Sequence, residues 1–310
     1  MSISLRPASS HEPQPAPSRP WRRAISARTA DRLATGSLWA SAGIVVLVFA
    51  YLVLYTVARG APAFSFANLF SSDQTVGLAP QLFNTFYLLL LAMVPMLIIG
   101  LGAALYTVEY ARQGWLLAVL RFAVEALTSI PSIVIGLLGF LLFVTNFGAG
   151  QRWGFSRIAG ALALIILNLP WMLRLIEDAL RAVPVAYREA SMALGATRLQ
   201  TLWRVVLPSA VPGLATAVLI VAGRVVGESA ALIYTAGSAG STTGWLTPQL
   251  SHVAGDTLAV HIWNLFADNP TPQSVNGQTE TALVLIVLVL ALNVGARVLA
   301  GRLRKRFAGK

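Results

Sequence analysis

The 310-residue sequence contains no cysteine and only three histidines, and charged residues make up 11% of it. The absence of cysteine excludes disulfide bonds and thiolate metal sites, and the three scattered histidines do not form a set of metal ligands. No G-x-x-x-x-G-K-[ST] phosphate-binding loop occurs, which excludes ATP hydrolysis through that motif. Because a soluble domain carries about 25% charged residues, most of this chain is not suited to an aqueous environment.

Long apolar runs fill much of the remaining sequence, and hydrophobic residues make up 56% of the chain. About twenty such residues are needed for a helix to cross a ~30 Å hydrocarbon core, and a helix satisfies its own backbone hydrogen bonds in lipid. The sequence therefore predicts an all-α, polytopic membrane protein with six transmembrane helices. These spans are expected at residues 37–58, 85–108, 122–145, 158–176, 209–235 and 281–301.

The formal net charge of +11 is distributed unevenly between the connections. Arginine and lysine gather in the N-terminal tail, in the loops after the second and fourth spans, and in the C-terminal tail. The remaining connections contain only Arg59, Arg152 and Arg157. By the positive-inside rule, this alternation places both termini in the cytoplasm. A nucleic-acid-binding role needs the basic residues on one soluble face, so we expect no nucleic-acid partner.

The ends of the chain differ in composition from its apolar centre. Residues 1–33 are rich in proline, serine and arginine, which predicts a disordered basic cytoplasmic tail. Residues 34–304 form the expected transmembrane domain, and residues 305–310 form a second cytoplasmic tail. The first apolar run lies behind a long basic leader and continues past any small-residue cleavage point. This favours a retained first span over a cleaved signal peptide.

Two pairs of charged residues lie within or near the expected spans. Arg224 and Glu228 are four residues apart in the fifth span and so share a helix face. They form either an ion pair that helps to pack the bundle or a cationic site for an anion, in which Glu228 orients the guanidinium. Arg174 and Glu177 lie near the end of the fourth span. They either cap the helix and reach the interface or face a substrate pathway.

The chemistry of arginine favours an anionic substrate. A mid-membrane arginine costs at least ~2.5 kcal/mol, which a packing contact between apolar residues would avoid. Its planar guanidinium donates two parallel hydrogen bonds to phosphate or carboxylate oxygens, whereas a neutral sugar has no use for it. Pro131 and Pro170 are expected to bend the third and fourth spans next to serine and asparagine side chains that could line a polar path.

A polar segment at residues 177–208 separates the fourth and fifth spans. Its sequence predicts a short helix from Val185 to Leu194, which Gly195 ends, and a second amphipathic helix from Thr197 to Val206. The mixed apolar and charged residues suit docking into the groove of a partner. The alternative is a helix that lies on the membrane surface with its arginines toward anionic lipid.

Within this segment, Glu189-Ala190-Ser191 is followed by Gly195 at a fixed offset and then by Val205-Val206-Leu207-Pro208. This pattern resembles the EAA loop of bacterial ABC importer permeases, except that Ser191 replaces the second alanine. The segments EALTSIPSIVIG and GRVVGESAALIYTAG narrow the resemblance to phosphate ABC transporter permeases of the PstA type, over about residues 31–304.

The resemblance implies an ABC importer permease fold with cytoplasmic coupling helices, in which the EAA loop docks into a separate ATPase. The residues expected to couple to that ATPase are Glu189, Ala190, Ser191, Gly195, Leu207 and Pro208. The intramembrane arginine and acidic residues of the family fall on Arg174, Glu177 and Arg224.

The implied importer moves inorganic phosphate across the bacterial cytoplasmic membrane, with this chain embedded in membrane lipid. Its other parts are a PstC-type second permease, a dimer of PstB-type ATPases and an extracytoplasmic PstS-type phosphate-binding protein. ATP and Mg²⁺ are bound by the ATPase. We therefore expect no cofactor in this chain and no enzymatic activity of its own.

Three other interpretations stay open at this point. The intramembrane arginines also fit a permease for another oxyanion, such as sulfate or molybdate. A membrane-embedded enzyme needs clustered histidine or carboxylate side chains, for which His252, Asp256 and His261 are candidates in one expected outer loop. Transporters of this kind can also signal phosphate status, and the basic tail could bind a regulator or lie against anionic lipid.

Overall fold

The computed structural model describes residues 26–71, 77–112, 114–145, 153–237, 246–267 and 271–308. Within these ranges the regular structure is entirely helical, which confirms the predicted all-α class. The chain divides into two units between Leu54 and Tyr55. The first unit contains the part of helix α1 (Ala27–Ala63) that precedes Tyr55, and the second contains everything that follows.

Helices extend into both segments for which the sequence predicts a tail. α1 begins after Ser26, whose hydroxyl accepts a hydrogen bond from the Thr29 N–H at 3.2 Å as an N-cap does. α11 (Pro272–Ala308) continues through part of the second predicted tail. α1 and α11 therefore extend beyond the spans expected at residues 37–58 and 281–301, because alanine, leucine, arginine and lysine favour continued helix there. Residues 1–25 and 309–310 lie outside the described residues.

Five helices of the described residues are long and apolar enough to cross a membrane, and a sixth span results if two helices joined at a bend count as one. This agrees with the polytopic protein that the sequence predicts. In the second unit, α2 continues directly into a π-helical turn, η1, and α5 continues as one helix through Pro170. The bounds are Ala79–Leu105 for α2, Tyr106–Tyr110 for η1, Arg157–Arg181 for α5 and Leu207–Val226 for α8.

The third expected span, residues 122–145, is two helices bent by 98° rather than one. Pro131 lacks a backbone N–H and forces an extended conformation on the residue before it. Ile130 accordingly has a ψ of 130°, which ends α3. The sequence predicts the bend at Pro131, whereas the single helix is not found. The bounds are Trp115–Ser129 for α3, Ser132–Gly139 for α4 and Phe140–Thr145 for the π-helical turn η2 that extends it.

The fifth expected span, residues 209–235, also ends early. α8 stops before Gly227, and the short helix α9 (Ala230–Ile233) follows after a break. The Glu228 carboxylate lies in this break and accepts a hydrogen bond from the backbone N–H of Ala231 at 3.2 Å. It therefore satisfies one of the N–H groups that the start of a helix leaves without a partner.

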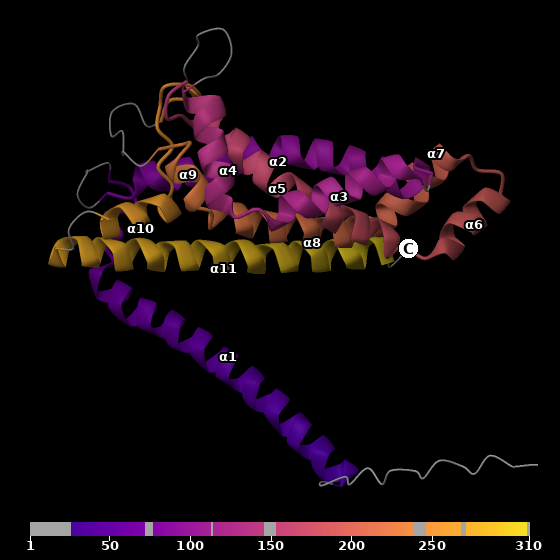
Figure 1. Cartoon of the computed structure of the whole chain (residues 1–310), viewed down its shortest axis with the longest axis horizontal. Helices are drawn as coiled ribbons and strands as arrows, with labels where there is room; N and C mark the ends of the chain where they lie inside the picture. The colour runs from indigo at the N-terminus through magenta and orange to yellow at the C-terminus, as the bar shows by residue number, and fades with distance from the viewer. Residues whose placement is uncertain are drawn as a thin grey trace, which may run out of the picture. The chain divides into compact units, whose positions relative to one another are not determined.

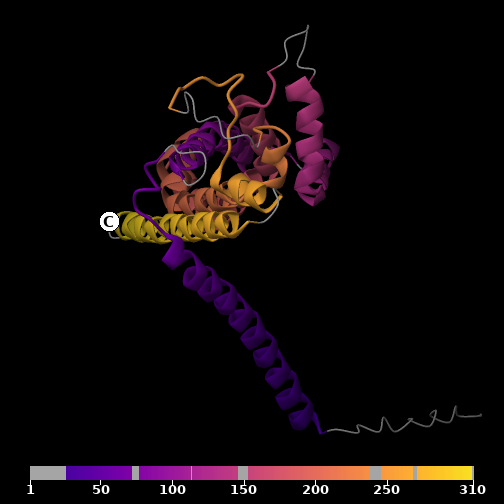
Figure 2. The same cartoon turned by 90° about the vertical axis from the view of Figure 1, so that its left-hand side faces the viewer.

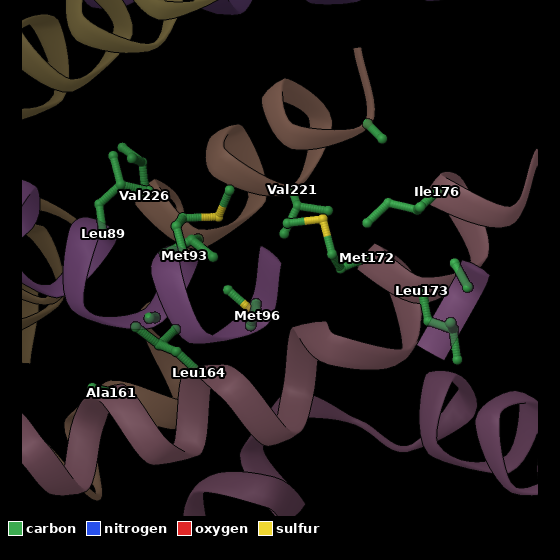
Figure 3. Close-up of a cluster of buried hydrophobic side chains, with 14 of the residues drawn as sticks. Leu89, Met93, Met96, Ala161, Leu164, Met172, Leu173, Ile176, Val221 and Val226 are labelled. Carbon is green, nitrogen blue, oxygen red and sulfur yellow. The ribbon is translucent and has the colours of Figure 1, made fainter. Parts of the chain in front are cut away.

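The core of the second unit lies between α2, α5 and α8, and α11 packs along α8 (Figures 1 and 2). Figure 3 shows side chains from the three central helices pointing toward one another, including Met93, Leu164 and Val221. The short helices α6 and α7 lie at one end of this bundle, and α4, α9 and α10 lie at the other (Figure 1). The bounds are Val185–Ala193 for α6, Arg198–Thr201 for α7 and Leu258–Ala267 for α10.

α4 and α9 pack so closely that Gly136 leaves no room for a side chain. A Cβ atom at this position would lie 2.8 Å from the Cα atom of Ala231 and 3.1 Å from the carbonyl oxygen of Ala230. We expect Gly136→Leu to lower the free energy of unfolding by about 1–3 kcal/mol, as overpacking does, measured by thermal unfolding in detergent. Gly102→Leu is the matched control, because no atom of the described residues beyond its own stretch of helix lies within 4 Å of a Cβ there. An equal loss in both variants would contradict this account of the packing.

Candidate functional site

Arg224, on α8, is held by α5 rather than by an acidic residue of its own helix. Its Nε donates a hydrogen bond to the side-chain oxygen of Asn168 at 2.9 Å, and its guanidinium lies 5.3 Å from the ring centroid of Trp171. Asn168 is buried and donates in turn to the carbonyl oxygen of Leu164 at 3.0 Å. Within the described residues no ion pair joins Arg224 to Glu228, which lies beyond the end of α8. The predicted Arg224–Glu228 pair is therefore not formed.

The terminal nitrogens of Arg224 have no hydrogen-bond partner in the described part of the chain, and the side chain is exposed. The guanidinium is fixed through its Nε and through its contact with an aromatic ring. It therefore presents its remaining N–H groups as a rigid fork. That fork matches the oxygens of an oxyanion better than a cation or a neutral solute.

The face of α5 that holds Arg224 continues toward the end of the bundle where α6 lies. Asn168 and Trp171 are neighbours on the surface of α5, and so are Trp171 and Arg174, because each pair is three residues apart. Arg174 comes six positions after Asn168, which places it about 9 Å further along the helix axis and about 120° around it. The two arginines that the sequence predicts as pathway residues therefore both lie beside α5, at different positions around the helix.

Arg174 lines a cavity of about 260 Å³ between α3 and α5. Its wall combines apolar side chains with charged residues of both signs. The charged residues are Arg121 and Glu125 from α3, and Arg174, Glu177, Asp178 and Arg181 from α5. The cavity therefore presents charges of both signs beside apolar side chains, and its arginines and carboxylates are equal in number.

Glu177 is buried in the wall of this cavity and has two partners. Its Oε2 accepts a hydrogen bond from Arg181 at 2.7 Å, one turn along α5. Its Oε1 accepts a hydrogen bond from the hydroxyl of Thr107 in η1. Glu177 and Arg174 share the cavity, but within the described residues no ion pair joins them, and Glu177 pairs with Arg181 instead.

The polar loop folds as two short helices at the positions that its sequence predicts. α6 is followed by Gly195 with a φ of 86°, a left-handed conformation that favours glycine. The Gly195 N–H donates to the carbonyl oxygen of Met192 at 3.0 Å, which closes the end of the helix. Thr197 then caps α7 in a capping box with Gln200, and the π-helical turn η3 (Leu202–Val206) leads into α8.

Ser191, the departure from the EAA pattern, connects the two helices of the loop. Its hydroxyl forms a 2.9 Å hydrogen bond with the hydroxyl of Thr201, a buried residue at the end of α7. An alanine at this position has no hydroxyl with which to make the bond. The serine therefore adds a contact between α6 and α7.

The surface of the loop has the features of a docking site. Leu194 is 90% exposed, and Glu189 and Ala190 are exposed on α6. Leu207 and Pro208 are half-buried where α8 begins and join the loop to the bundle. Large exposed apolar side chains beside polar ones mark interaction surfaces. We call α6, α7 and the turn between them the docking loop.

One ion pair of the docking loop is not predicted from the sequence. Arg188, on α6, contacts the carboxylate of Glu109 in η1, with 3.0 Å between Nη2 and Oε1. Its guanidinium also donates to the carbonyl oxygens of Leu180 and Val183. Carbonyls at the C-terminus of a helix lack intrahelical partners, and an arginine can satisfy them. No local pattern indicates the pair, because its members lie 79 residues apart.

A buried polar cluster at the opposite end of the bundle surrounds Asp256. Its carboxylate contacts Gln81 of α2 at 3.2 Å and His261 of α10 at 3.3 Å. Burial raises the pKa of Asp256, against the lowering effect of its hydrogen bonds to His261 and Gln81. Of the three residues considered for a catalytic role, the structure joins Asp256 and His261. It gives His252 a backbone contact with Trp153 instead.

Arg157, which the sequence indicates only as a loop residue, is fully buried at the start of α5. Its Nε donates to the side-chain oxygen of Asn84 at 2.9 Å, and its Nη1 donates to the carbonyl oxygen of Thr247. Asn84 donates in turn to the backbone oxygen of Asp256 at 3.1 Å. These bonds hold the segment before α10 against α2. No local sequence pattern indicates them, because the bonded residues lie far apart along the chain.

Residues 96–309 match the family model of the binding-protein-dependent transport system inner membrane component. The chain is 36% identical over 294 residues to the "Probable ABC transporter permease protein YqgI" of Bacillus subtilis, a match that covers 91% of this chain and 99% of that protein. It is 32% identical over 295 residues to the "Phosphate transport system permease protein PstA 2" of Mycobacterium bovis, covering 93% and 94% respectively. A chain of a bacterial alginate ABC transporter crystal structure has the same fold, with a TM-score of 0.62 at 17% identity over 89% of this chain and 95% of that one.

Proposed function

This chain belongs to the family of binding-protein-dependent transport system inner membrane components, and we propose that the solute its importer carries is inorganic phosphate. As a member of that family it is a multi-pass inner-membrane protein and the permease component of an ABC importer. Such components do not themselves catalyse a reaction. They work with an ATPase and with a solute-binding protein.

The observation that carries the phosphate proposal is the way α5 holds Arg224. Asn168 and Trp171 fix the guanidinium and leave its terminal N–H groups available. A tetrahedral oxyanion accepts two parallel hydrogen bonds from such a fork, whereas a cation is repelled by it. Among oxyanions, phosphate is supported by the 32% identity to a relative named as a phosphate transport system permease protein.

The proposed pathway runs beside α5. Phosphate meets Arg224 first, passes along the surface that contains Trp171, and reaches the cavity that Arg174 lines. Conduction requires sites that bind strongly enough to admit the solute and weakly enough to release it. The carboxylates of Glu177 and Asp178 in the cavity oppose tight binding of an anion, which favours release.

The docking loop defines the proposed orientation and partners. It faces the cytoplasm together with both chain termini, as the arginine distribution predicts. There it docks into a dimer of PstB-type ATPases, which bind ATP and Mg²⁺. A PstC-type permease completes the pathway, and a PstS-type protein delivers phosphate on the other side. Closure of the ATPase dimer on ATP moves Glu189 and Gly195, and the spans switch between outward-facing and inward-facing forms.

ATP-dependent uptake of radiolabelled phosphate tests this function. The vesicles contain this chain with its candidate permease, ATPase and binding-protein partners, and vesicles without ATP are the control. We expect unlabelled phosphate to suppress the uptake and an excess of sulfate or molybdate to leave it unchanged. Equal competition by sulfate or molybdate would assign the importer to another oxyanion. No phosphate uptake by an assembled complex would overturn the substrate assignment.

A further inference from the structure

The π-helical turn η1, at the end of α2, carries two polar side chains that bond to two different parts of the protein. Thr107 and Glu109 lie two residues apart in a turn of five residues. π-Helical turns within α-helices are rare and frequently occur at functional sites. Neither residue belongs to the docking loop or to the lining of the cavity, so the proposed function leaves both without a role.

Glu109 connects η1 to the docking loop. Its Oε1 accepts a hydrogen bond from the Arg188 Nε at 3.1 Å and lies 3.0 Å from the Nη2 of the same residue. That guanidinium also donates to the carbonyl oxygens of Val183 at 2.7 Å and Leu180 at 2.9 Å. The side chains of Arg188 and Glu109 are only 15% and 20% exposed, so water competes little for these bonds. The first half of α6 is therefore fixed to η1.

Thr107 connects η1 to the cavity. Its hydroxyl donates to Glu177 Oε1, while the other carboxylate oxygen of Glu177 accepts from Arg181. Thr107 is 5% exposed and Glu177 is 8% exposed. A hydrogen bond to a buried carboxylate is stronger than one between neutral groups, and its loss leaves a charge incompletely satisfied. The position of Glu177 in the cavity wall therefore depends on the position of η1.

We propose that η1 transmits motion between the docking loop and the arginine-lined cavity. A displacement of α6 reaches η1 through Arg188 and Glu109, and it reaches the cavity through Thr107 and Glu177. Thr107 and Glu109 are thus positioning residues, which act through their partners rather than on the solute. The proposal rests on the proposed function in that an ATPase moves the docking loop and a solute occupies the cavity.

A transmitting role and a purely stabilising role predict different results when both bonds are removed. Two bonds that only stabilise the fold change the free energy of unfolding, but they leave the coupling of ATP hydrolysis to import intact. Two bonds that transmit motion in series both change that coupling, and breaking the second changes little once the first is broken. Contacts alone do not establish coupling between sites, and the deciding measurement is therefore a double-mutant cycle on coupling itself.

The test uses the assembled importer in proteoliposomes and measures the number of ATP molecules hydrolysed per solute imported. Thr107→Val removes one bond at nearly constant volume, and Glu109→Ala removes the other. We expect each to raise this ratio by about fivefold or more, the lower end of typical coupling between sites. The double variant should match the larger single effect. Thr107→Ser keeps the hydroxyl and should restore the ratio of the unaltered importer.

Thr216→Val is the matched control, because the Thr216 hydroxyl bonds to Pro212 of its own helix at 2.9 Å. Co-purification of the ATPase checks assembly. If Glu109→Ala prevents it, Glu109→Gln, which keeps the shape of the side chain and removes its charge from the contact with Arg188, takes its place in the cycle. Additive effects, or an unchanged ratio in every variant, would exclude a transmitting role for η1.

The unaltered importer separates this proposal from the substrate assignment. If it imports sulfate or molybdate in place of phosphate, the substrate assignment fails, and the ratio measured with that anion still tests η1. If the unaltered importer carries phosphate and Thr107→Val leaves the ratio unchanged, the substrate assignment stands and only the proposal for η1 fails.

Discussion

Replacement of Arg224 by glutamine is expected to lower phosphate uptake by about ten- to a hundredfold while the importer still assembles. A hydrogen bond to a charged group contributes about 1.5–3 kcal/mol, and about 1.4 kcal/mol corresponds to a factor of ten. The glutamine amide can still reach toward Asn168, but it has neither the positive charge nor the two-pronged donor geometry. The initial rate of radiolabelled phosphate uptake in vesicles measures the effect, and co-purification with the ATPase measures assembly.

Two further variants make the Arg224 result specific. Arg224→Lys keeps the charge without the planar fork, so we expect an intermediate rate. Arg297→Gln removes an exposed arginine of α11 outside the candidate pathway and should leave uptake unchanged. Unaltered uptake by Arg224→Gln would remove Arg224 from the pathway. A similar loss in Arg297→Gln would show that total charge, rather than a site, determines the rate.

The features predicted correctly from the sequence are those with a local cause. Run length places the membrane-spanning helices, because the thickness of the hydrocarbon core fixes the number of residues. Gly195 ends α6 because the chain there adopts a left-handed conformation. Pro131 bends the third span because it lacks an N–H and restrains Ile130. In each case the residue that produces the feature lies within the segment concerned.

The continuity of a helix is less visible in the sequence than its apolar composition. The runs across Pro131 and Gly227 are apolar enough for single spans, yet each contains a break. Hydropathy reports how well side chains suit lipid, but it does not report whether every backbone hydrogen bond of the helix is made. Bonds such as that from Ala231 to the Glu228 carboxylate replace those that the helix would supply.

The polar contacts of the candidate site could not be predicted from the spacing of residues along the sequence. The oxygen of Asn168 that holds Arg224 is 56 residues away along the chain, whereas the sequence favours Glu228, four residues away. The Gln81–Asp256 contact spans 175 residues. Local spacing determines which residues share a helix face, but only the packing of α5 against α8 determines which helix supplies the partner. The identities of the pathway arginines could therefore be proposed from sequence, and their partners could not.

Gly195→Asp is expected to separate ATP hydrolysis from phosphate import. The φ of 86° at this position costs other residues roughly 1–2 kcal/mol. Apart from the chain neighbours of Gly195, no atom in the described ranges lies within 4 Å of a Cβ there, so the effect is not a steric clash. The new carboxylate would stand next to the exposed Leu194 on the docking loop. We expect the number of ATP molecules hydrolysed per phosphate to rise by about fivefold or more.

Gly154 offers a matched control, since it also has a positive φ, 62°, and open space around a Cβ. Gly154→Asp adds the same charge and similar backbone strain before α5, away from the docking loop, and should keep the normal ratio.

Gly195→Asn separates strain from charge, because asparagine is neutral and adopts the left-handed conformation more readily than most residues. Coupling kept by asparagine and lost with aspartate would make charge on the docking surface decisive. Loss of coupling in both variants would make the left-handed backbone conformation at residue 195 decisive. Unchanged coupling in both variants would mean that the ATPase does not contact this turn.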